Sequence, residues 1–585
     1  MSKHWSVRPP LSKTIEKKLA SFSELVRTLL YYRGVETLEE AEAFLNPDYT
    51  KSIHDPFLMK DMDKAVERIL KAIKDNEKIV IFGDYDADGV PGTAIIASFF
   101  KQIGFTNFTP YIPDRHLESY GLNITQVEKF AADGVTLIIT VDCGITAIDE
   151  TARARELEVD VVITDHHLTQ EKLPQAVAVI DPKREDCDYP CKVLCGAGVA
   201  FKLVQGLLAR GNFNVIPGWE KWLLDLVAIS TVSDMVPLSG ENRVLVKFGL
   251  VVLNKTRRPG LLSLLVALKL KPGIITEDDI GFMIGPRINS ASRMTHGSEA
   301  YELLMTDDWA TARTIATNLE KNNKERKVMV EKIMKTVIER CGDQELPGVV
   351  VIGEDEWGLG VLGLASARIT EKYGRVSFVW GKNGDGLIKG SCRSDGSVSV
   401  VELMQAAGGL DFFAGLGGHI HAGGFSLLPE RLPELEDKLL KAYESLSKEE
   451  VVEELWVDTE LQLSEVTWDT YKEIDKLAPF GIDNSKPLFL FRDIEIDRVK
   501  TFGTGGAHIE LCFTEGSRSI LAIGFFACPP TFDTDDEFDP TSGHHFENVS
   551  LAPGRRIDLL AHFDKSNFRN FPELRLRIVD IRSVV

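Results

Sequence analysis

The sequence at residues 79–90 is Ile-Val-Ile-Phe-Gly-Asp-Tyr-Asp-Ala-Asp-Gly-Val. Its apolar first half predicts a buried strand, and the residues from Thr93 to Lys101 predict a helix after it. Three carboxylates stand between them at alternate positions, Asp84, Asp86 and Asp88. Carboxylates this close repel one another unless a cation offsets the repulsion, so the stretch predicts a metal site. An acidic turn or a single Ca²⁺ loop has the same local pattern, and the residues downstream decide between these interpretations.

Three further apolar runs predict strands, at residues 135–141, 159–163 and 176–180. Helical patterns separate the first three predicted strands, for example at residues 145–157, and this alternation predicts a parallel sheet with right-handed crossovers. A polar group follows each strand, and an acid also follows a later apolar segment: Asp142, then Asp165, His166 and His167, then Asp181, and finally Asp234. Because the carboxyl ends of parallel strands meet at one edge of a sheet, these side chains should converge there.

A set of carboxylates with imidazoles suits Mn²⁺ or Mg²⁺ better than a thiolate zinc site. The candidate ligands are Asp84, Asp86, Asp142, His166, His167 and Asp234. This set is too large for one metal and about right for two. Two metals about 3.5–4 Å apart, bridged by one carboxylate, can activate a water and neutralise the leaving oxygen of a phosphate ester.

Within this set, Asp142 is the expected bridge, because its strand should lie near the middle of the sheet edge. Adjacent side chains on an extended backbone point in opposite directions. We therefore expect one of His166 and His167 to bind metal, while the other contacts phosphate or supports the ligands from behind. Asp165 is expected to orient one of the two rings.

The whole chain is predicted to be an α/β multidomain protein. Residues 12–75 and 301–340 have helical patterns, whereas short alternating apolar runs from residue 456 onward are typical of a small barrel. The predicted division is an N-terminal helical segment at 1–60, a parallel-sheet catalytic domain at 61–300, a connecting helix at 301–345, a second α/β domain at 346–455, and a barrel at 456–585 with an acidic loop at 531–552.

Composition narrows the class of protein. The 585 residues are enough for three or four domains, and an apolar fraction of 44% is ordinary for globular chains. No apolar run reaches the roughly 18 residues of a transmembrane helix, and the first residues lack the apolar core of a signal peptide. The eight cysteines follow no secreted framework, so we expect a cytoplasmic protein without a membrane anchor. A net charge of -21 argues against bulk coating of nucleic acid, although a local basic groove would still be compatible with binding it.

The ordered motifs resemble those of the DHH phosphoesterase superfamily: Asp-x-Asp-x-Asp-Gly at 84–89, Asp142, Asp-His-His at 165–167, and Asp234. More closely, the chain resembles the RecJ family of bacterial single-strand-specific 5′→3′ exonucleases. That resemblance extends over nearly the whole chain and includes residues 44–47, 54–57, 196–202, 285–289, 389–394, 417–419 and 478–481.

The resemblance implies a DHH domain, a long helix, a DHH-associated domain and a C-terminal OB fold. It also implies two divalent metal ions, Mn²⁺ or Mg²⁺, and stepwise release of 5′-mononucleotides from single-stranded DNA in repair and recombination. The six candidate ligands match the metal set of the family, with Asp88 and Asp165 supporting them from behind. Expected partners are single-stranded DNA, a single-strand-binding protein and a RecQ-type helicase, and the expected state is a monomer.

The resemblance also implies residues that contact the substrate. Arg115, Ser391 and Arg393 match positions around the 5′-terminal phosphate, where the planar arginine fork binds phosphate bidentately. Further matches are Arg287, Asn289 and Arg293, which could hold the strand, and His419, which lies among glycines. We expect positive potential to be confined to a groove between the two catalytic lobes, near Arg115, Arg287, Arg293 and Arg393.

The sequence departs from the family pattern at three positions. Phe82 and Gly358 stand where many relatives have histidine, and Gly423 replaces an alanine. None of these changes removes one of the six candidate ligands. Cys187, Cys191 and Cys195 have regular spacing, but without an evident fourth ligand they predict a reduced surface loop rather than a metal site. Barrel aromatics such as Phe489 and Phe491 are more often core residues than base-stacking platforms, and the sequence alone does not separate the two roles.

Two other functions fit parts of the pattern. A DHH nano-RNase or phosphatase acting on short nucleotides would share the ligands, but such relatives are generally shorter and lack the OB-like region. A non-catalytic replication scaffold, of the kind formed by eukaryotic RecJ-like helicase subunits, would have lost ligands, whereas all six are present here.

Overall fold

The computed structural model describes residues 3–118, 120–342, 346–382, 384, 386–448, 453–503, 506–525, 551–566 and 571–584. Contacts divide the chain into two compact units. One consists of Ser52–Val451, and the other combines Met1–Lys51 with Val452–Val585. The acidic loop predicted at 531–552 lies almost entirely outside the described residues.

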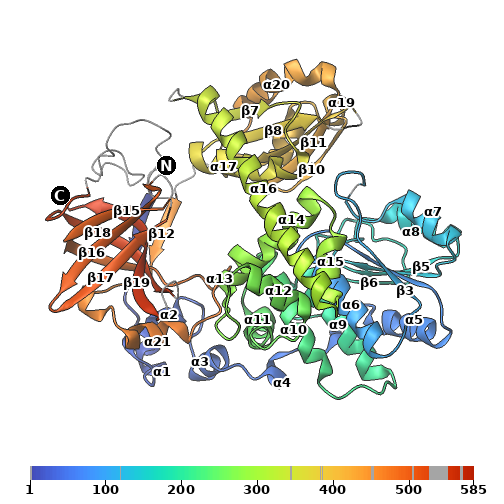
Figure 1. Ribbon diagram of the computed structural model, residues 1–585, viewed down its shortest axis with the longest axis horizontal. Helices are drawn as coiled ribbons and strands as arrows, with labels where there is room; N and C mark the ends of the chain where they lie inside the picture. The colour runs from blue at the N-terminus through green and yellow to red at the C-terminus, as the bar shows by residue number, and fades with distance from the viewer. Residues whose placement is uncertain are drawn as a thin grey trace. The chain divides into compact units, whose positions relative to one another are not determined.

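A five-stranded parallel sheet forms the centre of the first unit (Figure 1). Its strands, in spatial order, are β3 (Phe108–Tyr111), β2 (Ile79–Gly83), β4 (Leu137–Val141), β5 (Asp160–Thr164) and β6 (Ala178–Ile180). All four neighbouring pairs are parallel, as predicted. The central strand is β4, so Asp142 does follow the middle of the sheet. The sequence did not predict β3, because this strand is short, only partly buried and contains a proline.

Helices cover both faces of this sheet, which explains why its strands are continuous apolar runs rather than alternating ones. Every residue of β2 and β4 is buried. The helices that alternate with the strands are α5 (Met62–Lys74), α6 (Gly89–Gln102), α7 (Ile124–Ala132) and α8 (Ile148–Glu156). Upstream of them lie the short helices α4 (Tyr49–Ser52) and η1 (Pro56–Leu58).

A helical region follows β6 and completes the catalytic lobe. Its helices are α9 (Gly196–Arg210), η2 (Trp219–Leu223), α10 (Leu224–Ser233), α11 (Gly240–Leu253), α12 (Pro259–Ala267), α13 (Glu277–Asp279), η3 (Ile280–Ile284), α14 (Gly285–Met294) and α15 (Ser298–Met305). Asp234 follows a helix rather than a strand, because it caps the C-terminus of α10. The apolar segment before it, ten residues long and mostly buried, is a buried helix, which a short apolar run cannot distinguish from a strand.

A single long helix, α16 (Trp309–Cys341), leads to a mixed sheet (Figure 1). That sheet contains β10 (Gly415–Gly418), β11 (Ala422–Leu427), β9 (Ile388–Arg393), β8 (Val376–Lys382) and β7 (Val349–Gly353), in that order. Its helices are α17 (Leu359–Tyr373), α18 (Val400–Ala406), α19 (Gly409–Phe412), η4 (Pro429–Arg431) and α20 (Leu432–Ser445). Val330, Ile333 and Val337 of α16 share a core with Leu362 and Ala365 of α17, so the connecting helix is packed against this lobe.

The second unit is a seven-stranded sheet with the first residues of the chain packed against it. The strand order is β13 (Thr459–Glu460), β14 (Phe489–Glu495), β18 (Arg556–Ser566), β19 (Glu573–Ser583), β17 (Arg518–Gly524), β16 (His508–Glu515) and β15 (Arg498–Phe502). Phe489 and Phe491 are fully buried, which confirms their interpretation as core residues.

The N-terminal residues expected to form a helical segment of their own share this core. Ile15 and Leu29 belong to the same buried cluster as Phe491. They lie on α1 (Lys13–Lys18) and α2 (Glu24–Tyr31), which precede α3 (Leu38–Leu45). In addition, β1 (Lys3–Val7) pairs in parallel with β12 (Glu453–Val457). The unit also contains η5 (Leu463–Glu465) and α21 (Trp468–Asp475).

The prediction of a surface loop for three cysteines is wrong. Cys187, Cys191 and Cys195 are all buried, between β6 and α9. The Cys195 thiol accepts a hydrogen bond from the amide of Gly198 and so caps α9. Local spacing did not reveal this role, because burial depends on the helices that pack over the segment.

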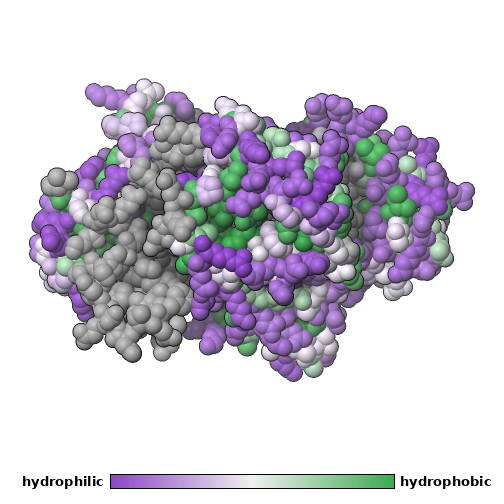
Figure 2. Space-filling model, turned by 90° about the horizontal axis from the view of Figure 1, so that it is seen from above, coloured by the Kyte–Doolittle hydropathy of each residue, from purple (hydrophilic) through white to green (hydrophobic). Residues whose placement is uncertain are grey.

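The face of the molecule seen in Figure 2 is mostly hydrophilic. Hydrophobic residues gather there in patches between the hydrophilic ones. Among the residues that the structure describes, no helix is both long enough and apolar enough to cross a membrane.

Candidate active site

The loop between β2 and α6 presents the first carboxylates. Asp86 accepts hydrogen bonds from the amides of Asp88 and Gly89, at 2.8 and 3.1 Å, which turns the chain into the helix. The side chain of Asn289 accepts a further bond from the Ala87 amide at 2.9 Å. A Cβ on Gly89 would lie 2.5 Å from the carbonyl oxygen of Asp84, so this tight turn requires glycine. The loop is therefore fixed from both sides.

Asp142 lies at the end of the central strand in a strained conformation. Its φ of 61° is rare for a residue other than glycine, and such strain concentrates at functional sites. The N-terminus of α9 approaches it so closely that a Cβ on Gly196 would lie 2.5 Å from the Asp142 Cβ. This packing fixes the direction of the buried carboxylate.

The predicted ligands do converge, in three overlapping groups. Asp84 and Asp86 meet Asp142; Asp142 meets His166 and His167; and His166 meets Asp88 and Asp234, with the potential ligand atoms of each group within 4.8 Å of one another. The Nε2 atom of His166 lies 3.1 Å from an Asp142 oxygen and 3.7 Å from an Asp234 oxygen. Asp142 and His166 each belong to two groups, and the Asp142 carboxylate lies where a residue bridging two metal ions would lie.

Asp88 differs from the other carboxylates because protein groups outside the ligand set donate hydrogen bonds to it. Its two oxygens accept hydrogen bonds from the Gly196 and Ala197 amides at the start of α9, at 2.6 and 2.7 Å, and from the hydroxyl of Ser230. A helix N-terminus stabilises negative charge, so this carboxylate is already compensated by protein groups. The contacts suit the supporting role expected for Asp88, although one oxygen also lies 3.5 Å from His166 Nε2.

The two histidines lie side by side rather than on opposite sides of the chain. Their ring centroids are 4.6 Å apart, because the backbone leaves the extended conformation after Thr164. Asp165 accepts hydrogen bonds from the backbone amides of both histidines and lies 2.8 Å from the Nδ1 atom of His167. Asp165 therefore holds the His167 ring, as the sequence suggested for one ring of the pair.

Burial and mutual repulsion shift the titration of this cluster. Burial raises the pKa of Asp84 and of Asp142 well above the usual range, and neighbouring carboxylates raise both further. Burial and the charges of Asp88 and Asp86 raise the pKa of Asp234 to about 8. Burial lowers the pKa of His166. In His167 the effect of burial is outweighed by the bond to Asp165 and by nearby acids, and the pKa rises to about 9.

The donor set fits divalent metal ions. One oxygen of Asp84, one oxygen of Asp142 and the Nδ1 atom of His166 are buried without a hydrogen-bond partner. A protein interior rarely leaves such groups unpaired, and buried carboxylates need a cation to remain charged. Hard oxygen ligands combined with imidazole suit Mn²⁺ or Mg²⁺. The repulsion that raises the carboxylate pKa values is what bound cations would offset.

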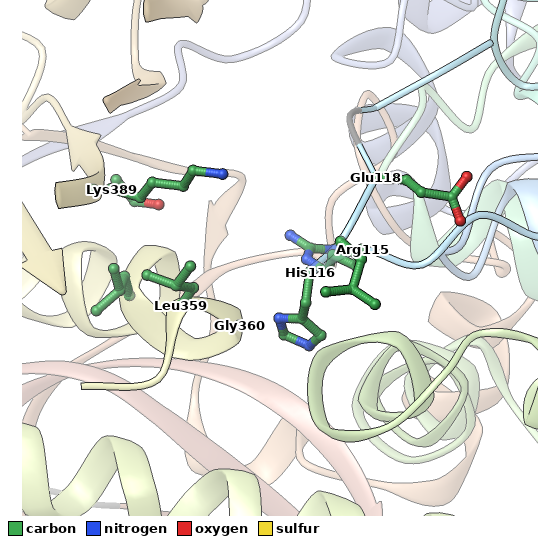
Figure 3. Close-up of a pocket in the computed structure, with 10 residues that line it drawn as sticks. Arg115, His116, Glu118, Leu359, Gly360 and Lys389 are labelled. Atoms are coloured by element: carbon green, nitrogen blue, oxygen red, sulfur yellow. The ribbon is translucent and has the colours of Figure 1, made fainter. Parts of the chain in front are cut away.

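A pocket of about 240 Å³ lies between the catalytic lobe and the mixed-sheet lobe of the same unit. Figure 3 shows Arg115, His116 and Glu118 on one side, from the segment after β3, and Leu359, Gly360 and Lys389 on the other. Ser391 also lines the pocket. The structure therefore brings together two of the three residues expected around a terminal phosphate, and Arg393 lies next to them, near Gly363 and Ser391.

The remaining predicted contacts are distributed differently. Arg287 is buried and paired with Glu320 of α16 at 2.9 Å, so it ties two helices together. Arg293 donates to the carbonyl of Gly360, which lines the pocket, and burial together with Arg115 lowers its pKa to about 10. His419 is exposed at the connection between β10 and β11 and is not among the residues that line the pocket.

Sequence reasoning missed two polar contributors. The hydroxyl of Tyr120 donates to the carbonyl of Asp142 at 3.1 Å and lies 3.4 Å from His167 Nδ1. No local pattern marks this tyrosine, since it comes from a loop. Lys389, by contrast, belongs to the motif at 389–394, where it could have been recognised as a pocket cation.

Two of the departures from the family pattern lie in packed surroundings. The ring of Phe82 is fully buried and stacks on Tyr111, so it belongs to the core on one face of the sheet. Gly358 precedes α17, and a Cβ there would contact Met329 at 3.2 Å.

Three domain families match the chain. The DHH family N-terminal domain matches residues 78–231, the DHHA1 domain matches residues 346–445, and the RecJ OB domain matches residues 457–580. The parallel sheet, the mixed sheet and the C-terminal barrel thus correspond to the expected DHH, DHH-associated and OB domains.

Whole proteins and solved structures match as well. The single-stranded-DNA-specific exonuclease RecJ of Bacillus subtilis is 34% identical over 98% of this chain and 70% of its own length. That of Salmonella typhimurium is 32% identical over 96% of both chains. RecJ of Thermus thermophilus in complex with Mn²⁺ has the same fold, with a TM-score of 0.80 and 24% identity over the whole chain and 80% of that protein. An exonuclease RecJ bound to manganese is 31% identical, with a TM-score of 0.59, over 66% of this chain and 95% of that one.

Proposed function

The chain belongs to the RecJ family of single-stranded-DNA-specific exonucleases, and we propose that it degrades single-stranded DNA from the 5′ end by metal-dependent hydrolysis, releasing 5′-mononucleotides. One observation carries the proposal. The six carboxylates and imidazoles implied by the resemblance come from four separate segments of the chain, and together with Asp88 they form overlapping groups that share Asp142 and His166.

The metal ions would be held by Asp84, Asp86 and Asp142 on one side and by Asp142, His166 and His167 on the other, with Asp234 joining the second set through its group with His166 and Asp88. Bound Mn²⁺ or Mg²⁺ supplies the charge that lowers the pKa of an attacking water and stabilises the leaving oxygen. Asp142 is shared between the two groups, and its strained backbone holds it in place before substrate arrives. Asp88 and Asp165 keep the ligands oriented through their own hydrogen bonds.

The pocket supports the proposal that hydrolysis starts at an end of the strand. Arg115, Lys389 and Ser391 offer positive charge and a hydroxyl group, which suit a terminal phosphate. The pocket and the metal ligands occupy the same compact unit, and Arg115 is close enough to Asp84 to affect its titration. A strand whose terminal phosphate sits in the pocket would place an internal phosphodiester near the metal ligands.

Further proposals concern where the protein acts, its oligomeric state and its partners. We expect the protein to act in the cytoplasm as a monomer on single-stranded DNA. A single-strand-binding protein and a RecQ-type helicase would be its partners, because the substrate must be exposed and kept unpaired. The OB domain supports the choice of single-stranded DNA, since OB folds commonly bind single strands.

The test uses a 5′-phosphorylated single-stranded DNA oligonucleotide labelled at its 3′ end, with Mn²⁺ or Mg²⁺. We expect a ladder that shortens from the 5′ end and no products from blunt duplex. Asp142→Ala should abolish the ladder while the melting temperature shows that the fold survives. Cleavage of dinucleotides alone would favour the nano-RNase, and cleavage of neither substrate would favour the scaffold. An active Asp142→Ala protein would contradict the proposed metal centre.

A further inference from the structure

Tyr85 lies between two candidate metal ligands in the sequence and contacts an arginine of the phosphate pocket in space. The guanidinium carbon of Arg115 lies 4.7 Å from the centroid of the Tyr85 ring. Arg115 comes from the segment after β3 and lines the pocket, whereas Tyr85 comes from the loop after β2, between Asp84 and Asp86. The contact therefore joins the metal loop directly to the pocket.

Arg115 has few other anchors. Within the described part of the chain, its guanidinium donates no hydrogen bond and forms no ion pair, so all five N–H groups remain available to a ligand. A long side chain of this kind would normally sample many rotamers, and binding would then cost the entropy of ordering it. The face of the Tyr85 ring is the contact that limits this freedom, through a cation–π interaction.

Tyr85 itself is held firmly. A Cβ on Gly297 would lie 3.2 Å from the Tyr85 Cβ, so the start of α15 packs directly against the tyrosine backbone. The Asn289 side chain fixes the same loop two residues later, at Ala87. The platform under Arg115 is thus rigid with respect to the candidate metal ligands.

We propose that Tyr85 is a positioning residue that fixes Arg115 for the 5′-terminal phosphate and so sets the distance from that phosphate to the metal centre. This inference rests on the proposed function. It has a specific consequence: preference for phosphorylated over unphosphorylated 5′ ends depends on an aromatic face at position 85. The Tyr85 hydroxyl is not required for this role, because a cation–π contact uses the face of the ring.

The experiment measures KM and kcat of the full chain on 3′-labelled single strands that carry either a 5′-phosphate or a 5′-hydroxyl. Tyr85→Leu should lower the preference for the phosphate, expressed as a ratio of kcat/KM values, by about five- to twentyfold, the range for loss of a partly desolvated cation–π contact. The loss should appear mainly in KM for the phosphorylated strand. Tyr85→Phe should retain the wild-type ratio.

Two further variants complete the design. Arg115→Ala should lose at least as much of the preference, and adding Tyr85→Leu to it should change the ratio no further, since the two residues act as a unit. Phe57→Leu is the matched control, because it removes a comparable contact, with Arg210 at 4.2 Å, elsewhere in the same unit. It should leave the ratio unchanged. If melting curves show that Tyr85→Leu does not fold, Tyr85→His provides a smaller ring and should give an intermediate ratio.

The outcomes separate the inference from the function. A wild-type protein that degrades no single-stranded DNA would overturn the proposed function itself. A wild-type enzyme without preference for the 5′-phosphate, or a Tyr85→Leu enzyme that keeps it while Arg115→Ala loses it, would overturn only the role of Tyr85. An equal fall in kcat on both ends, together with a higher Mn²⁺ requirement, would also overturn it, because Tyr85 would then act through the metal loop.

Discussion

Asp165 belongs to none of the three groups of potential metal ligands, yet it holds both histidines in place. Its carboxylate accepts hydrogen bonds from two backbone amides and holds the His167 ring through Nδ1. A histidine ligand depends on such a partner for its tautomer and orientation, and removing the partner typically costs metal affinity. Despite the opposing effect of burial, these contacts lower the pKa of Asp165, so it remains charged.

We therefore predict that Asp165→Asn weakens Mn²⁺ binding by about 10- to 100-fold, the usual range for such partners. Asparagine can still accept from the amides, so the fold should persist, but it cannot supply the charge that orients His167. The measurement is the electron paramagnetic resonance signal of free Mn²⁺ during titration. Asp188→Asn, at an exposed position in the same lobe, is the control. Equal affinity in the two variants would mean that His167 is not a metal ligand.

At the scale of single residues, the sequence predicted the metal ligands whose place follows from the order of strands in the parallel sheet. Asp84, Asp142 and His166 could be identified because each follows an apolar strand of a parallel sheet. The mutual placement of the two histidines could not, because it depends on where the chain leaves the strand. Tyr120 was missed for a similar reason, since its hydroxyl reaches Asp142 from a loop that has no periodic pattern.

Helices α14 and α16 pack against each other, and this explains why one expected DNA contact has another role. Arg287 of α14 is buried, pairs with Glu320 of α16, and also donates to the carbonyl of Met283. Its Nε and Nη1 groups are therefore committed within the protein. Arg115, which has no such partners in the described residues, is the better candidate for a phosphate contact.

Arg287→Ala should therefore reduce stability more than binding. We expect a loss of about 2–4 kcal/mol, somewhat below the value for a fully buried pair because Glu320 remains in partial contact with water. Chemical denaturation of the variant measures this loss. In Arg287→Ala, the dependence of KM on salt concentration should be the same as in the wild type. In Arg115→Ala, the slope of log KM against log salt concentration should fall by about 0.7, the value for one lost phosphate contact on a single strand. If the slope fell as much in Arg287→Ala as in Arg115→Ala, Arg287 would contact the DNA after all.

Two secondary-structure elements could not be predicted from the periodicity of apolar residues alone. The apolar segment before Asp234 could have been a strand or a helix, and only its ten-residue length favours the helix that is observed. Strand β3 escaped prediction because it is only four residues long and lies at the edge of its sheet. Edge strands are less buried, so their hydrophobic signal is weaker.

Over the whole chain, the two ends share one unit. The helical pattern at the N-terminus predicted a separate segment, but local periodicity contains no information about a partner more than 400 residues away. The pairing of β1 with β12 and the shared core of α2 with β14 are such long-range contacts. The barrel should therefore depend on residues at the opposite end of the sequence.

The substitution Leu29→Ala tests this dependence. Leu29 is fully buried on α2, in the cluster that also contains Phe491 and Leu559. Truncating a buried leucine costs about 2–5 kcal/mol, depending on how well the cavity collapses. Because the unit formed by the two ends has its own core, the cost should fall on that unit alone. Hydrogen exchange should accelerate in β14 and β18 and remain unchanged in β2 and β4.

Leu264→Ala is the matched control, because Leu264 is equally buried on α12 of the other unit. It should accelerate exchange near α12 and leave β14 protected. If Leu29→Ala accelerates hydrogen exchange equally in both units, the two units unfold together as one cooperative body and are not energetically independent. If it loosens neither, the N-terminal helices cover the barrel without stabilising it. Selective loss would mean that the residues before the DHH domain are a structural part of the OB unit, so a truncated N-terminus would impair the barrel while leaving the metal centre intact.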